Sequence, residues 1–160
     1  MTIRRADAND LAPIWAILEP VIRSGETYTL DRDLDRDAAL AYWFAPAHEV
    51  WVAGEDSRTL GTYFLKANQG GGGAHVANCG YMTASAAQGR GVARAMCAHS
   101  LDRARAHSFL AMQYNLVVST NERAVRLWES FGFGRAGRLP GAFLHPGLGL
   151  VDAFVMYRSL

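Results

Sequence analysis

The chain has 160 residues, of which 50% are hydrophobic and 19% are charged. A chain this apolar can bury enough surface to offset the entropy of ordering, which excludes extended disorder, and its length predicts a single domain over residues 1–160. The 16 basic and 15 acidic residues give a formal charge of +1. We therefore expect no nucleic-acid partner, because no strong field favours a polyanion.

The sequence contains no clear signal for membrane insertion, secretion, disulfide formation or metal binding. Apolar stretches are interrupted well before the roughly 20 residues needed to cross a bilayer, and the N-terminal residues 1–7 lack the apolar core of a secretion signal. This predicts a cytoplasmic protein that does not bind membranes. Cys79 and Cys97 form no C-x-x-C pair, and the histidines form no H-E-x-x-H motif. We expect two buried thiols and no metal site.

The N-terminal third predicts a short strand and two helices. Thr2–Arg5 alternates as an edge strand does, and Asp7 is a good N-cap. A helix should follow, because apolar residues recur at helical spacing at Leu11, Ile14, Trp15, Leu18 and Ile22. The polar loop Arg23–Thr29 is of the kind that shapes a binding mouth. A second helix is expected from about Asp35 to Phe44.

The middle of the chain predicts a strand-rich region. Val50–Ala53 and Thr59–Lys66 read as a hairpin around a turn at Gly54–Ser57. The glycine tract Gly70–Gly73 predicts a flexible loop. His75–Thr83 is expected to form the next strand.

The C-terminal half continues as helix, strand, helix and strand. A helix is expected to begin within Gln88–Ala93 and to run to about His107, followed by a buried strand at Met112–Ser119. Ser119 and Glu122 fit a capping box, with Ser119 as the N-cap. The following helix carries an apolar stripe and closes at Gly132, and Val151–Arg158 predicts a last strand.

A glycine loop between a strand and a helix is the strongest chemical signal. Gln88-x-x-Gly91-x-Ala93 places several backbone N–H groups at the positive end of a helix, which favours phosphate. The loop lacks the lysine and hydroxyl residue of a P-loop. It also lacks the glycine spacing and distal acid of a dinucleotide site. A coincidental glycine turn is the alternative reading.

This loop resembles the pyrophosphate loop of the GCN5-related N-acetyltransferase (GNAT) superfamily. A second signature of that family has its counterpart in Asn121-x-x-Ala124-x-x-Leu127-Trp128-x-x-x-Gly132-Phe133, and the resemblance covers essentially the whole chain. It implies an α/β (α+β) fold with a mixed, mostly antiparallel sheet of about seven strands and about four helices. The sheet should be splayed between its fourth and fifth strands.

The resemblance implies acetyl-CoA as co-substrate, direct attack of an amine on the thioester, and no metal. The diphosphate would lie on the N–H groups of Gly89–Ala93, and the backbone of Met82 and Thr83 would hold the pantetheine and polarise the thioester carbonyl. The implied cofactor-binding residues are Met82, Thr83, Gln88, Gly89, Arg90, Gly91, Val92, Ala93, Asn121 and Trp128.

Trp128 departs from the family pattern, which often has a tyrosine at this position that protonates the leaving thiolate. Indole cannot supply that proton. The Asn121 amide, a water molecule or Tyr114 are the alternatives. The thiolate could also leave unassisted, because a thiol pKa of about 8.5 makes it a tolerable leaving group. No general acid is assigned.

A closer resemblance is to yeast N-acetyltransferases that detoxify proline analogues such as azetidine-2-carboxylate. It rests on His75-x-x-Asn78-x-Gly80, Asn115-Leu116-Val117 and Asn121. It implies that Asn78, Asn115 and Asn121 line the active centre, and that Asn78 and Asn115 bind the substrate carboxylate or hold a proton-relaying water. The alternatives are that the Asn78 and Asn115 amides bond loop backbone and that Asn121 caps a helix. Residues considered for the remaining roles are Glu26 as base, His75 or His145 as less favoured bases, and Arg23 and Tyr28 as substrate-binding residues.

From this resemblance we expect an acetyl-CoA-dependent N-acetyltransferase. Its expected substrate is a small amine, such as an amino acid or proline analogue, and its expected role is detoxification. The alternatives are acetylation of a protein N-terminus or lysine, and a non-catalytic acyl-CoA sensor. The last strand and the apolar segment Phe143–Val151 predict either a homodimer surface or internal packing.

Overall fold

The computed structural model describes residues 1–160 and contains one seven-stranded sheet. Its order is β1-β2-β3-β4-β5-β7-β6, and every neighbouring pair is antiparallel except β4 and β5. The strands are β1 (Thr2–Arg5), β2 (Glu49–Glu55), β3 (Arg58–Ala67), β4 (Val76–Thr83), β5 (Ala111–Val118), β6 (Gly134–His145) and β7 (Gly149–Ser159). The mixed, mostly antiparallel architecture expected from the family resemblance is confirmed.

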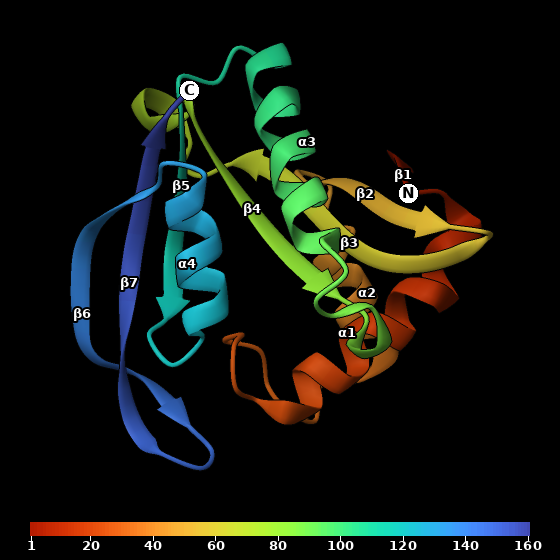
Figure 1. Ribbon diagram of the computed structural model, residues 1–160, viewed down its shortest axis with the longest axis horizontal. Helices are drawn as coiled ribbons and strands as arrows, with labels where there is room; N and C mark the ends of the chain where they lie inside the picture. Colours follow the sequence, from red (N-terminus) through yellow and green to blue (C-terminus); the bar gives the residue numbers. More distant parts are fainter.

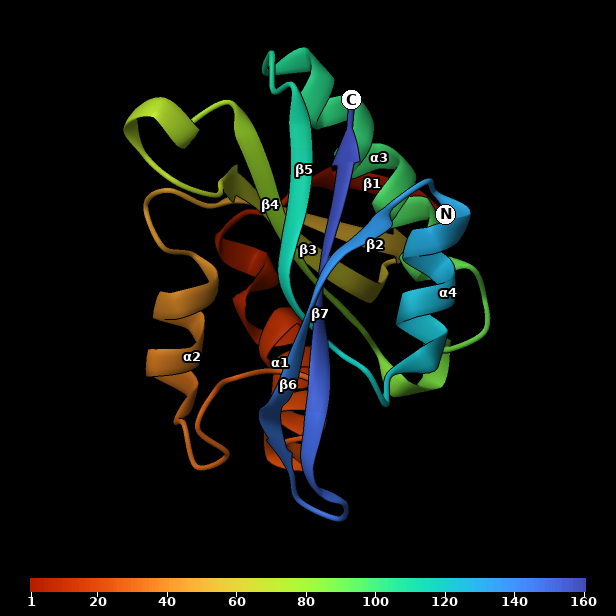
Figure 2. The ribbon, with the colours of Figure 1, turned by 90° about the vertical axis from the view of Figure 1, so that its left-hand side faces the viewer.

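Four α-helices cover the two faces of the sheet (Figure 2). Helices α1 (Leu11–Ser24) and α2 (Arg36–Trp43) pack on one face, in a core that includes Ile14 and Trp43. Helices α3 (Val92–Ala106) and α4 (Glu122–Ser130) contribute to a second core on the other face. No helix combines the length and apolarity that crossing a bilayer requires.

Helix α4 begins at a different cap from the expected one. The Asn121 Oδ1 accepts from the Ala124 N–H at 3.3 Å, so Asn121 is the N-cap. The prediction of Ser119 was wrong. The Ser119 N–H donates to the Asp152 carbonyl at 2.9 Å, which keeps Ser119 beside β7 and outside the helical turn.

Strand β6 has no counterpart among the segments predicted from the pattern. Of its twelve residues only Phe143 is buried, so the strand lacks the hydrophobic alternation that marks a half-buried strand. Three leucines near the β6–β7 turn are exposed: Leu144 by 71%, Leu148 by 64% and Leu150 by 72%. Of the Phe143–Val151 segment, Phe143 packs internally as one of the two alternatives predicted. These three leucines do not pack internally.

The two parallel strands separate soon after they meet (Figure 1). The pairing of β4 with β5 is limited to Val76 with Ala111 and Ala77 with Met112. Further along, an irregularity between Tyr114 and Val117 shifts the register of β5 against β7. The expected splay between the fourth and fifth strands is confirmed, and it leaves the second half of β4 without a partner on its β5 side.

Candidate active site

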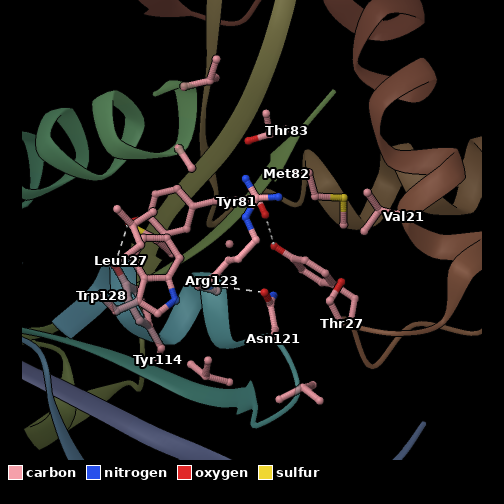
Figure 3. Close-up of a pocket in the computed structure, with 18 of the residues that line it drawn as sticks. Val21, Thr27, Tyr81, Met82, Thr83, Tyr114, Asn121, Arg123, Leu127 and Trp128 are labelled. Atoms are coloured by element: carbon pink, nitrogen blue, oxygen red, sulfur yellow. Dashed lines mark hydrogen bonds between the residues drawn. The ribbon is translucent and has the colours of Figure 1, made fainter. Parts of the chain in front are cut away.

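A cavity of about 680 Å³ lies where β4 and β5 diverge. Its lining combines residues of the α1–α2 connection, such as Thr27 and Tyr28, with residues of the α3 and α4 N-termini, such as Gly91 and Asn121 (Figure 3). Helices α1 and α2 lie on the opposite face of the sheet from α3 and α4. The cavity in the gap is therefore lined by residues from elements on both faces of the sheet.

Backbone donors of β4 face this gap. Successive residues of a strand direct their N–H and C=O groups to opposite neighbours. Val76 O accepts from Asn68 N and Ala84 N donates to Leu60 O, both on the β3 side. By this alternation the N–H groups of Tyr81 and Thr83 face the gap, whereas that of Met82 faces β3. The Thr83 N–H is therefore directed toward the gap and the Met82 N–H away from it, although both residues line the cavity.

The glycine loop presents a run of unpaired N–H groups. Gly89 and Gly91 have φ of +78° and +80°, a region that L side chains rarely adopt. The N–H groups of Gln88 and Arg90 close local turns onto Ser85 O and Ala87 O. Those of Gly89, Gly91, Val92, Ala93 and Arg94 have no backbone acceptor. Such an array at a helix N-terminus is suited to an anion.

One arginine expected at this loop turns away, and two others take its place. Arg90 pairs with Glu55 at 2.6 Å and does not line the cavity. Arg94 and Arg123 do line it. Arg94 donates to Ser130 Oγ, whereas Arg123 has no hydrogen bond or salt bridge within the chain. Apart from their charge, no motif in the sequence distinguishes these two residues.

The Arg123 side chain crosses the cavity from α4 toward the glycine loop and β4 (Figure 3). Its Nη2 lies 4.0 Å from the position that a Cβ on Gly89 would occupy. A free guanidinium therefore faces the same space as the unpaired N–H groups. Guanidinium binds phosphate oxygens well because its planar donors match their geometry.

The three asparagines play different structural parts. Asn78 is 8% exposed, and its Nδ2 donates to Gln113 O at 2.9 Å. Every enclosed side-chain N or O atom of the chain is hydrogen-bonded, so the unpartnered Asn78 Oδ1 is accessible from the cavity. Asn115 is exposed at the rim and donates to Asn68 Oδ1 at 2.7 Å. Asn121 caps α4 and also lines the cavity.

Aromatic side chains form one wall. Trp128 packs against Tyr81 and Tyr114, with both centroid distances 5.0 Å. The Trp128 indole N–H has no partner in the chain and faces the cavity (Figure 3). Burial raises the pKa of Tyr81 and of Tyr114, so both phenols are neutral at pH 7.

The Tyr114 hydroxyl points its proton away from the cavity. Ser100 Oγ donates to Cys97 O at 2.8 Å, so it must accept from Tyr81 Oη at 2.7 Å. Tyr81 Oη in turn accepts from Tyr114 Oη at 3.0 Å. Because this donor is already committed to a buried chain, the geometry disfavours Tyr114 as the acid that protonates a leaving group.

Tyr28 closes the opposite wall. Its hydroxyl donates to Tyr81 O at 2.8 Å and thereby fixes the α1–α2 connection to β4. Gly80 makes this approach feasible, because a Cβ there would lie 2.6 Å from the Phe64 ring and 3.2 Å from Tyr28 Oη. The expected place of Tyr28 beside the substrate space is consistent with this arrangement.

Two polar residues of the same loop lie elsewhere. Arg23 donates to Leu34 O at 2.9 Å and stacks over Trp15, so it supports the loop from outside the cavity. Glu26 is exposed and does not line the cavity, and neither do His75 and His145. The structure thus contradicts the expected positions of Arg23 and Glu26. A residue pattern in a polar loop carries no information about the direction in which each side chain points.

Comparison with known proteins identifies relatives of this chain. A family model described as the acetyltransferase (GNAT) family matches residues 14–133. The N-acetyltransferase aca1 of Schizosaccharomyces pombe is 30% identical over 151 residues, which cover 84% of this chain and 72% of that protein.

Solved structures of acetyltransferases are also similar to this chain. A GCN5-related N-acetyltransferase from Kribbella flavida has 40% identity and a TM-score of 0.95, with 99% of this chain and 97% of that chain covered. The putative acetyltransferase yncA from Salmonella typhimurium, solved with acetyl-CoA, has 26% identity and a TM-score of 0.88, with 100% and 94% covered.

Proposed function

This chain belongs to the GNAT family of acetyltransferases, and we propose that it transfers the acetyl group of acetyl-CoA to the amine of a small molecule. One observation carries the proposal. The unpaired N–H groups between Gly89 and Arg94 and the free guanidinium of Arg123 border the same space beside the open gap in the sheet. This combination supports binding of the CoA diphosphate, with the pantetheine extending into the gap.

The gap supplies electrostatic stabilisation for the reaction. In our proposal the N–H groups of Tyr81 and Thr83 contact the pantetheine and the thioester carbonyl, where they stabilise negative charge as the tetrahedral intermediate forms. The amine enters from the α1/α2 face, so that its nitrogen approaches the carbonyl carbon from the side opposite the cofactor loop. Positioning of the two reactants is the main contribution of the protein.

The bond changes follow from this placement. The neutral amine attacks the carbonyl carbon to form the N–C bond, the C–S bond breaks, and CoA leaves as its thiolate. The amine proton passes to solvent water, because the cavity lining contains no carboxylate or imidazole. Asn78 Oδ1 orients the amine or the water that accepts its proton. The indole N–H of Trp128 donates a hydrogen bond to the departing sulfur without transferring a proton.

An assay of thiol release tests this proposal. Purified protein is incubated with acetyl-CoA and, in turn, with azetidine-2-carboxylate, a panel of free amino acids, and peptides with free N-termini or internal lysines. Release of CoA that depends on a small amine is the expected result. Release only with peptides would instead assign protein acetylation. Binding of acetyl-CoA without release on any amine would assign a sensor.

A further inference from the structure

Lys66 is the only lysine in the chain, and it lines the cavity. It lies on β3 directly opposite Asn78 on β4. Directly opposite residues in neighbouring strands share one face of the sheet, and for this pair the face is that of Phe64 and Met82, which is covered by α1 and α2. Lys66 therefore lies in the half of the cavity from which the amine enters.

The ammonium group of Lys66 has no ion-pair or hydrogen-bond partner within the chain. The charged residues that line the cavity are Lys66, Arg94 and Arg123, and none is acidic. Arg94 and Arg123 belong to the glycine-loop end. Lys66 is thus the only charged residue at the acceptor end, where it is half-buried without a counter-ion.

The other titratable groups near Lys66 are uncharged at neutral pH. His48 stacks on Phe64 with 4.0 Å between ring centroids, and burial lowers the pKa of its imidazole. Burial raises the pKa of Tyr28 and of Tyr42. The acceptor end therefore carries a net positive charge. It repels a simple ammonium ion and attracts a ligand that carries a negative group.

On the basis of the proposed function, we propose that Lys66 binds the carboxylate of the acceptor, which makes the substrate an α-amino or α-imino acid. The adjacent Asn78 Oδ1 is an unpartnered acceptor for the N–H of the same molecule. One carbon separates the amine from the carboxylate in such acids, so two neighbouring side chains can contact both groups at once. Polyamines and lysine side chains offer no anion to Lys66.

The test compares acids with matched amides. Rates of CoA release are measured for L-proline against L-prolinamide and for azetidine-2-carboxylate against azetidine-2-carboxamide. Each pair is tested with wild type, Lys66→Met, Lys66→Arg and Arg36→Met. Arg36 begins α2 and is exposed outside the cavity, so its variant controls for the loss of one positive charge. Circular dichroism checks that each variant folds.

We expect Lys66→Met to raise KM for the acid at least tenfold with a smaller change in kcat, and to reduce the acid-to-amide ratio of kcat/KM by a similar factor. Comparing this ratio between variants cancels the different basicities of acids and amides. Lys66→Arg should retain most of the preference, and Arg36→Met all of it. An unchanged ratio in Lys66→Met, or a wild-type enzyme that prefers the amides, would overturn the assignment.

A second readout does not depend on turnover. Pyridoxal phosphate followed by borohydride should modify the Lys66 amine, and mass spectrometry locates the modified residue. In the presence of CoA, azetidine-2-carboxylate should protect Lys66 from this modification more than azetidine does. Equal protection by both compounds would contradict the proposal. If amides are acetylated and the acid-to-amide ratio of kcat/KM does not change in the Lys66 variants, the assignment of Lys66 is wrong but the proposed acetyltransferase function stands. If no amine releases CoA, the proposed function fails as well.

Discussion

The side-chain amide of Asn78 donates to the carbonyl oxygen of Gln113 at 2.9 Å, one residue beyond the last ladder pair, Ala77 with Met112. This bond joins β4 to β5 at the point where the two strands separate. It also fixes the orientation of the amide, so that Oδ1 is left free at the apex of the gap. One residue therefore links the splay of the sheet to the proposed acceptor site.

Replacement of Asn78 by alanine should affect turnover more than cofactor binding. We expect kcat to fall about tenfold to a hundredfold, which corresponds to about 1.4–2.7 kcal/mol. The dissociation constant of acetyl-CoA should change less than about threefold, because the glycine loop is untouched. Steady-state kinetics and calorimetry measure the two quantities.

Asn68→Ala is the control, since Asn68 bonds Asn115 but does not line the cavity. A larger loss of acetyl-CoA affinity than of kcat would move Asn78 from the acceptor to the cofactor.

Gly91→Trp should abolish acetyl-CoA binding while the chain remains folded. A Cβ at Gly91 would meet no atom within 4 Å, so the indole would fill the open space over the loop and not the core. The matched control is Gly71→Trp, because Gly71 also has a positive φ, +53°, and open space around it, but lies in the β3–β4 connection. Calorimetric titration and thermal unfolding separate the effects. Unaltered binding in Gly91→Trp would refute the proposed place of the diphosphate.

Arg123→Ala should weaken binding of acetyl-CoA about tenfold, because one charge-assisted phosphate contact is lost. The same variant should bind acetyl-pantetheine, which lacks phosphate, as the wild type does. Arg126→Ala provides the comparison, since Arg126 on the same helix pairs with Glu122 and lies outside the cavity. Raising the salt concentration should diminish the difference between wild type and Arg123→Ala. If both ligands lose affinity equally, Arg123 does not act through phosphate.

The two cysteines should resist thiol reagents in the folded protein. Burial raises the pKa of Cys79 and of Cys97 to about 12, so at pH 8 a thiolate fraction on the order of 10⁻⁴ is expected. The folded state holds these protons more tightly than the unfolded chain, and the resulting stabilisation is therefore lost as the pH rises above about 8.5 toward 12. Reaction with Ellman's reagent before and after addition of denaturant measures the difference. Rapid reaction of native protein at pH 8 would be inconsistent with these buried positions.

The glycine loop could be predicted from the sequence because its chemistry is local. The positive φ of Gly89 and Gly91 depends on a few consecutive residues. The cap of α4 was assigned to Ser119 on the capping-box pattern, but Asn121 is the N-cap, and the Ser119 N–H instead bonds Asp152 on another strand.

Residues whose roles depend on distant elements were not accessible in this way. Lys66 and Arg123 reach the cavity only through the strand register and the placement of α4, and neither stands out in the sequence by a motif. Glu26 and Arg23 had suitable chemistry but point elsewhere. Strand β6 was missed because its exposed residues have no hydrophobic period.

The proposed reaction requires that the loop from Gln88 to Ala93 and the neighbouring gap hold acetyl-CoA. A crystal structure of the wild-type protein with acetyl-CoA would decide where the cofactor binds. We expect diphosphate oxygens on the N–H groups between Gly89 and Arg94, and a thioester within the gap between β4 and β5. Acetyl-CoA bound at any other surface, with this loop empty, would contradict it.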